Sequence, residues 1–353
     1  MIELVKTLTS LNGPCGYEHE VAYFIKDYLE GKADEAVIDS IGNVIARKKG
    51  TKPGPTVLVT AHMDEVGFIV KKIEGNGLLR FEKLGGHDDR ILLAKPVKVL
   101  GENGIVDGVI GTMSAHYVKF DDPSKVRKHS QLYVDIGASS KAEVQELGIE
   151  VGTPITWGTE WKMTGPKRKE VIISKALDDR AGCAVLLQLL NELQGEDFAG
   201  ELIFLFAVQE EVGLRGAQTA AASLEADAAI AVDTTAVSDT PEETMDQSLR
   251  LGDGTGIKVM DFSLIVHKTI KNLLVQAAKT NGIPYQLEVF PGIGTDGGAV
   301  ALSNKGIPTG VLSIPSRYAH SPVEMVSVTD LTATKDLLKA FVLELDQTAS
   351  FAF

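Results

Sequence analysis

The feature that most constrains the fold is a regular alternation of short apolar runs with amphipathic segments. Runs typical of strands lie at 43–47, 56–61, 171–174, 202–208, 228–232, 285–290 and 309–314, and helical periodicity covers 18–30, 180–194, 213–224, 266–280, 297–303 and 330–346. Strands that alternate with helices predict an α/β sheet with helices on both faces.

The alternation stops once, in the middle of the chain. Short β-type runs at 68–73, 78–83, 96–100, 105–110, 131–136 and 154–157 are separated by Gly, Asp, Asn and Pro, with helical character only near 140–147. We therefore expect an α/β domain built from residues 1–69 and 166–353, interrupted by a small all-β, barrel-like insertion at 70–165.

Composition excludes several classes of protein. The 35 Lys and Arg against 48 Asp and Glu give a net charge of −13, which argues against a nucleic-acid binder. The longest apolar runs, such as 202–208, are far shorter than the roughly 20 residues that span a bilayer, so no membrane partner is expected. Two cysteines make no disulfide framework, and residues 1–10 lack the pattern of a secretion signal. A cytoplasmic location is therefore expected.

Ionisable side chains follow the predicted strands of the α/β domain. They are His62 and Asp64 after 56–61, Asp178 and Asp179 after 171–174, Glu210 and Glu211 after 202–208, Asp233 after 228–232, and His320 after 309–314. In open α/β sheets, sites lie outside the carboxyl ends of the strands. We therefore expect these side chains to meet at one rim of one sheet.

Two imidazoles with several carboxylates and no thiolate suit Zn²⁺, Co²⁺ or Mn²⁺. More carboxylates are present than one tetrahedral ion needs. Two ions that share one bridging carboxylate, each with a terminal carboxylate and one histidine, would use these ligands more fully. Without cations, so many acids would repel one another strongly. The residues alone leave open whether Asp178 or Asp179 bridges, and which of Glu210 and Glu211 is a ligand.

The sequence resembles the M42 metallo-aminopeptidases. The matching motifs are NGPCGYEHEV (12–21), VTAHMDEVGFIV (59–70), SKALDDRAGCAV (174–185), VQEEVGLRGA (208–217), IAVDTT (230–235), GIGTDGGAV (292–300) and SRYAHSPVEMV (316–326). They cover nearly the whole chain, including the insertion. The resemblance implies a mixed sheet of the metallo-exopeptidase type, with the insertion serving for dimerisation.

The resemblance also implies a role for each site residue. His62 and His320 are terminal ligands, one on each ion, Asp178 bridges the ions, Glu211 and Asp233 are terminal carboxylates, Glu210 is the general base, and Asp64 hydrogen-bonds the far nitrogen of His62. The choice of Asp178 over Asp179, and of Glu211 over Glu210, rests on the family pattern.

The implied function is a dinuclear aminopeptidase that removes the N-terminal residue of short peptides, with Glu210 acting on a metal-bridging water. The expected cofactors are two divalent ions, Zn²⁺ or Co²⁺, with Mn²⁺ also compatible. The expected assembly is a homo-oligomer of dimers, up to a dodecamer of six dimers.

Two alternatives remain open. The first is a metal-dependent hydrolase of another substrate, a glycan or an acyl-amide; a glycosidase, however, needs two carboxyls facing each other across about 5–9.5 Å, and adjacent Glu210 and Glu211 point different ways. The second is a non-catalytic, metal-binding assembly protein, which the presence of Glu210 disfavours. The preferred side chain of the substrate is also open, because an acidic preference needs a cation in the pocket and Arg215, Arg250, Lys258 and Arg317 are all available.

Overall fold

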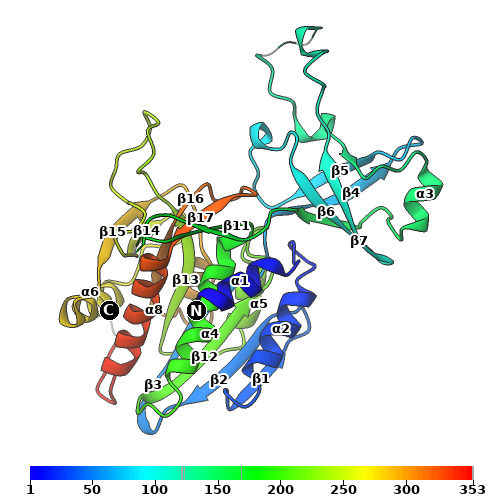
Figure 1. The fold of residues 1–353 in the computed structure, drawn as a ribbon. Coiled ribbons are helices and arrows are strands. Elements are labelled where there is room, and N and C mark those ends of the chain that lie inside the picture. Colours follow the sequence, from blue (N-terminus) through cyan, green and yellow to red (C-terminus); the bar gives the residue numbers. More distant parts are fainter. Residues whose placement is uncertain (121, 123, 168, 352–353) are drawn as a thin grey trace.

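The computed structural model describes residues 1–120, 122, 124–167 and 169–351, which fold into a large α/β region and a small β-barrel. We call the first region the body. Figure 1 shows the barrel, in cyan to green, projecting from one end of the body. Every helix within the described residues is too short or too polar to cross a bilayer.

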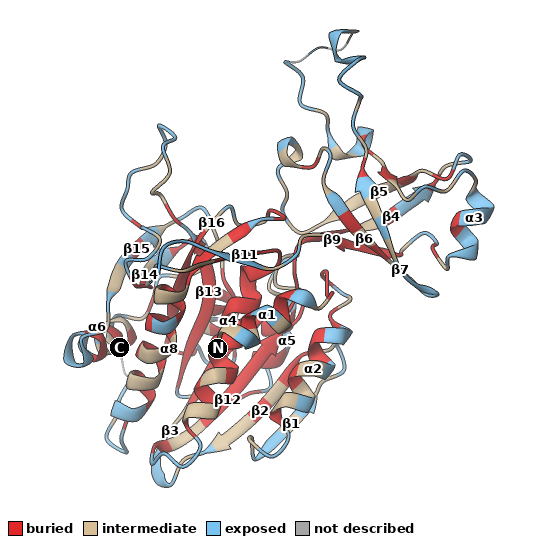
Figure 2. Cartoon of the chain, in the orientation of Figure 1, coloured by how far each residue is buried: buried red, intermediate tan, exposed pale blue. Residues whose placement is uncertain are grey.

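A mixed sheet forms the centre of the body, with eleven strands among the described residues. Its order is β1 (Glu35–Ile38), β2 (Val44–Lys49), β12 (Ala199–Ala207), β3 (Lys52–His62), β13 (Ala228–Ala236), β16 (Thr309–Arg317), β17 (Glu324–Ser327), β11 (Val171–Ser174) and β10 (Lys162–Thr164), while β14 (Thr255–Asp261) pairs with β16 and with β15 (Tyr285–Phe290). The neighbours β12, β3, β13 and β16 are parallel. They are buried on both sides, as Figure 2 shows, which explains their unbroken apolar sequences.

Helices cover both faces of this sheet. One face packs against α1 (Ile2–Ser10), α2 (His19–Leu29), α4 (Leu177–Glu192), α6 (Lys268–Asn281) and α8 (Val328–Glu344), and the other against α5 (Arg215–Ala221) and α7 (Asp296–Ala301). Along β3, Val57 and Val59 join the first core and Leu58 joins the second, as the alternation of side chains along a strand requires. The predicted fold class is confirmed.

The barrel closes through antiparallel pairs. Its strands are β4 (Gly67–Ile73), β5 (Leu79–Leu84), β6 (Pro96–Gly101), β7 (Gly104–Ile110), β8 (Val134–Asp135) and β9 (Pro154–Trp157), with helix α3 (Lys141–Glu146) and 3₁₀ turns η1 (Asp89–Ile91), η2 (Val118–Phe120) and η3 (His129–Gln131) between them. Phe68, Phe81 and Trp157 fill its own core, and the rings of Phe68 and Trp157 meet edge-on at 4.9 Å. Each described strand of the barrel therefore has a neighbour on both sides.

Candidate metal centre

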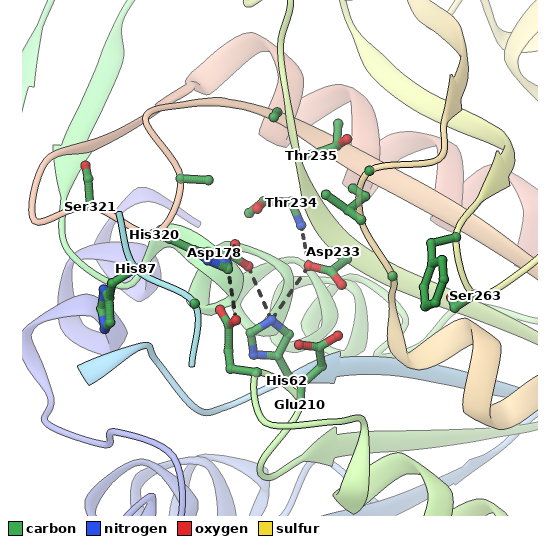
Figure 3. Close-up of a pocket in the computed structure, with 18 of the residues that line it drawn as sticks. His62, His87, Asp178, Glu210, Asp233, Thr234, Thr235, Ser263, His320 and Ser321 are labelled. Carbon is green, nitrogen blue, oxygen red and sulfur yellow. Dashed lines mark hydrogen bonds and ion pairs between the residues drawn. The ribbon is translucent and has the colours of Figure 1, made fainter. Parts of the chain in front are cut away.

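The parallel strands deliver ionisable side chains to one rim of the sheet (Figure 3). Strand β3 ends at His62, whose register partner on β12 is Ala207, three residues before Glu210. Asp233 lies on the neighbouring strand β13. His320 follows β16. The positions at which neighbouring strands end therefore determine which ionisable side chains lie close to one another.

Two groups of side chains share Asp178. In the first group, His62 Nε2 lies 3.2 Å from Asp178 Oδ1 and 3.7 Å from Asp233 Oδ1. In the second group, His320 Nε2 lies 3.5 Å from Asp178 Oδ2 and 3.1 Å from Glu211 Oε2. Within each group the candidate ligand atoms lie within 4.8 Å of one another. Asp178 thus offers one carboxylate oxygen to each group.

The structure separates the two adjacent aspartates that the residue types alone could not. Asp178 faces the two imidazoles, whereas Asp179 accepts the backbone N–H of Gly182 at 2.9 Å and lies 3.4 Å from that of His62. Both have non-helical dihedral angles, and a cis peptide bond joins them. Asp179 therefore serves the start of helix α4 and the end of strand β3, while Asp178 faces the cluster.

Asp64 connects three parts of the cluster. Its Oδ1 lies 3.4 Å from His62 Nδ1, and its two oxygens accept the backbone N–H groups of Glu210 at 2.9 Å and Glu211 at 3.1 Å. Burial raises the pKa of Asp64, but these hydrogen bonds and the charge of His62 outweigh burial and bring the pKa below its usual value. Asp64 is therefore a buried anion that orients one imidazole and the turn after β12.

One buried carboxylate outside the predicted set, Glu324, holds the backbone of the cluster. Glu324 Oε2 accepts the backbone N–H of Asp178 at 2.9 Å, and Oε1 accepts that of His320 at 2.9 Å. A single carboxylate thus fixes the backbone of two cluster residues that are far apart in the sequence. The signal for Glu324 in the sequence is its place at the end of the HSPVE motif.

A second buried network holds the start of the chain against the cluster. Lys175 Nζ lies 2.7 and 2.8 Å from the two carboxylate oxygens of Glu65, which also accepts a backbone N–H from the segment after helix α1. Arg180 donates to the backbone oxygens of Met63 and Leu8. These contacts tie helix α1 to the segments that carry the cluster, and sequence reasoning did not identify them.

The electrostatics of the cluster favour bound cations. Burial lowers the pKa of His62 and of His320, but the neighbouring carboxylates outweigh burial, and the pKa of His320 rises to about 12. Burial raises the pKa of Glu210, Glu211 and Asp233. Among the described side chains, Glu211 Oε1 is buried without a hydrogen-bond partner. A set of imidazole and carboxylate ligands with an unsatisfied buried oxygen fits divalent cations.

The cluster opens into a cavity of about 1030 Å³. Residues of the body and of the barrel line this cavity. His87 is one of the residues that the barrel contributes to the cavity. Its ring stacks on Phe68 at 4.6 Å, and its Nε2 lies 2.9 Å from the backbone oxygen of Gly67. Burial lowers the pKa of His87 to about 4, so this imidazole is neutral at pH 7. His87 thus forms part of the cavity wall as a neutral ring.

Fold and cluster together define a class: an α/β protein whose strand ends hold a histidine and carboxylate site suited to divalent cations. The sequence profile of the M42 glutamyl aminopeptidase family matches residues 42–337, and the chain belongs to this family. It is therefore a peptide-bond hydrolase of a family that depends on metal ions.

Individual relatives agree with this assignment. The solved structure of an aminopeptidase from Desulfurococcus kamchatkensis is 40% identical, with a TM-score of 0.91, over 97% of this chain and 94% of that chain. The TET1 peptidase of Pyrococcus horikoshii, described as assembling into a tetrahedron or a large octahedral shell, is 34% identical with a TM-score of 0.87 over 98% and 99% of the two chains. A lysyl aminopeptidase of Pyrococcus furiosus is 34% identical over 97% of each chain.

Proposed function

We propose that the protein is a dinuclear metal-dependent aminopeptidase. The observation that carries this proposal is the position of Asp178, whose two carboxylate oxygens lie beside two different imidazoles, His62 and His320. In the proposed site, His62 and Asp233 would hold one ion, His320 and Glu211 would hold the other, and Asp178 would be shared by both. Zn²⁺ or Co²⁺ suits this ligand set, and Mn²⁺ is also compatible.

Two such ions, when bound, polarise a peptide carbonyl and lower the pKa of a water molecule to about 7. Glu210 takes the proton of the attacking water and passes it to the leaving amine. Its carboxyl is close enough for this role, because Glu210, Glu211 and His62 offer candidate ligand atoms within 4.8 Å of one another. Asp64 supports the reaction indirectly, because it holds the backbone of Glu210 and the ring of His62.

The decisive experiment compares Glu210→Gln with the native protein after metal removal and reconstitution. The assay follows aminoacyl-anilide hydrolysis, and isothermal titration counts bound Zn²⁺ or Co²⁺. We expect Glu210→Gln to lose activity by about 10²–10⁴-fold while it still binds two ions. Glu225→Gln, at an exposed position of the body, serves as the matched control and should keep full activity.

The alternatives predict different results from the same samples. A non-catalytic assembly protein would bind metal with no difference between native protein and Glu210→Gln. A hydrolase of glycans or other acyl-amides would be active on those substrates and inactive on every aminoacyl-anilide. Binding of a single ion at saturation would contradict the dinuclear site.

We also propose that the protein assembles into dimers through the barrel, and that six dimers form a dodecamer. The similarity over the full chain to the TET1 peptidase of P. horikoshii, one structure of which is described as a dodecamer, supports this proposal. Light scattering coupled to gel filtration measures the mass directly, and a monomer at micromolar concentration would contradict it.

A further inference from the structure

The cavity has two sides, on opposite flanks of the cluster. Figure 3 shows His87 and Ser321 on one side and Thr235 and Ser263 on the other. The second side, which we call the neutral wall, consists of Thr235, Phe262, Ser263, Ile293 and Gly294. In a peptide whose amine is held at the cluster, the first side chain and the carbonyl occupy different bonds of one α-carbon, so the two would leave the cluster in different directions.

The hydroxyl groups of the neutral wall already have partners inside the protein. Thr235 Oγ1 donates to Glu288 Oε1. Ser263 Oγ donates to Asp261 Oδ1 at 2.8 Å and accepts the backbone N–H of Thr295 at 3.2 Å. Both hydroxyl protons are therefore engaged inside the protein, and the side chains of the wall present neither a charge nor a free donor to a substrate.

The nearest buried cation lies behind this wall and is compensated. Lys258 is fully buried, and its Nζ lies 3.4 Å from Glu288 Oε1 and 3.8 Å from Asp261 Oδ2. Thr235 separates it from the cavity through the hydrogen bond to Glu288. The positive charge of Lys258 therefore faces two carboxylates, although its Nζ has no hydrogen-bond partner among the described residues, and Lys258 does not line the cavity.

The three arginines that the sequence analysis named as candidates also lie outside the cavity. Arg317 forms two contacts with Asp239, at 2.8 and 2.7 Å, and Arg215 and Arg250 are exposed. Within the described residues, no lysine or arginine lines the cavity. An acidic side chain would therefore find no lysine or arginine partner in the cavity.

We propose that the neutral wall receives the first side chain of the peptide and selects a neutral, apolar residue such as leucine or methionine. This inference rests on the proposed function and names the substrate class of the same site. Phe262 is the wall residue to test, because its side chain lines the cavity and is 81% exposed, so that its replacement should not affect folding.

The first measurement compares kcat/KM of the reconstituted native enzyme for leucyl, methionyl, glutaminyl, glutamyl and lysyl anilides. We expect leucine and methionine to exceed glutamate and lysine by about 100-fold, with glutamine between them. Fastest cleavage of glutamate or lysine would overturn the inference and leave the proposed aminopeptidase intact. No cleavage of any anilide would overturn both.

The second measurement introduces a positive or a negative charge on the neutral wall. Phe262→Lys should raise the glutamyl-to-leucyl ratio, Phe262→Glu should raise the lysyl-to-leucyl ratio, and the two variants should differ by about tenfold in charge preference. Ile265→Lys is the matched control, because Ile265 is 77% exposed nearby but does not line the cavity. Equal ratios in Phe262→Lys and Phe262→Glu would overturn the assignment of this wall.

Discussion

The body and the barrel bury their apolar residues in sheets of different topology. Both have a buried apolar core, but the barrel closes its strands in an antiparallel ring, whereas the centre of the body is parallel. Antiparallel neighbours bring together residues that are close in sequence, while parallel strands align ends that are far apart in the chain. His62 and His320 both reach Asp178 because of this alignment, whereas the barrel contributes wall residues such as His87 and Ile91 to the cavity.

The largest loss of metal and activity should come from replacing Asp178, which lies beside both His62 and His320. Asp178→Asn removes a negative charge from both proposed ion sites, so we expect at least one ion to be lost and activity to fall by more than about 10³-fold. Metal content by mass spectrometry and anilide hydrolysis measure this. Asp107→Asn, the same change at an exposed position of barrel strand β7, should leave both unchanged. Two tightly bound ions in Asp178→Asn would contradict the shared ligand.

A core substitution in the barrel should separate stability from chemistry. Phe81 is 2% exposed, and its ring packs against Phe68 at 5.0 Å. Phe81→Ala should destabilise the fold by about 3–5 kcal/mol because it leaves a cavity, and Phe81→Leu should cost less. Urea unfolding measures the loss. Metal affinity of the folded protein should stay within about twofold, and a large change would mean that the barrel core shapes the site.

Replacing Glu324, which accepts the backbone N–H groups of Asp178 and His320, should have an intermediate effect on metal affinity. Glu324→Gln keeps the size of the side chain but leaves only one oxygen to accept the N–H groups of Asp178 and His320. We expect metal affinity to fall by about 10–100-fold, as for other groups that orient ligands. Competition with a chelator measures this affinity, and an unchanged value would mean that the ligand backbones are held without Glu324.

The last effect, confined to the dependence of stability on pH, concerns Asp296, a buried carboxyl at the start of helix α7. Neither of its oxygens has a hydrogen-bond partner among the described residues, and burial, followed by the charges of Asp233 and Asp64, raises its pKa to about 8. The folded state therefore keeps a proton that the unfolded chain releases near pH 4, so the contribution of Asp296 to the stability of the metal-free protein falls as pH rises from about 4 to 8. Asp296→Asn should reduce the difference in Tm between pH 5 and pH 8, and an unchanged difference would contradict this assignment.

The sequence predicted the elements whose pattern is local. Strand β3 and helices α2 and α8 fall close to their predicted ranges, because periodic apolar residues define each of them. Helix α1 and strands β1, β10, β14 and β17 were not predicted. Strand β17 has four residues and lies next to the HSPVE motif, so its pattern is too short to separate from a loop.

The residue types at the strand ends predicted where ionisable groups gather, but not the direction in which each one points. Asp178 and Asp179 have the same side chain, and only the backbone path after β11 turns one toward the imidazoles and the other toward helix α4. Glu324 and Glu65 act through the backbone groups of other residues, and such contacts leave no periodic signal in a sequence.

The order of strands in the sheet has a consequence for a chain that emerges from a ribosome. Strand β3 lies between β12 and β13, and both of these neighbours are synthesised after the whole barrel. The two edges of β3 must therefore wait more than a hundred residues for their partner strands, while the barrel strands, which pair mostly with one another, can already close. Until those strands are made, the unpaired edges of β3 are a site at which the nascent chain is prone to aggregate.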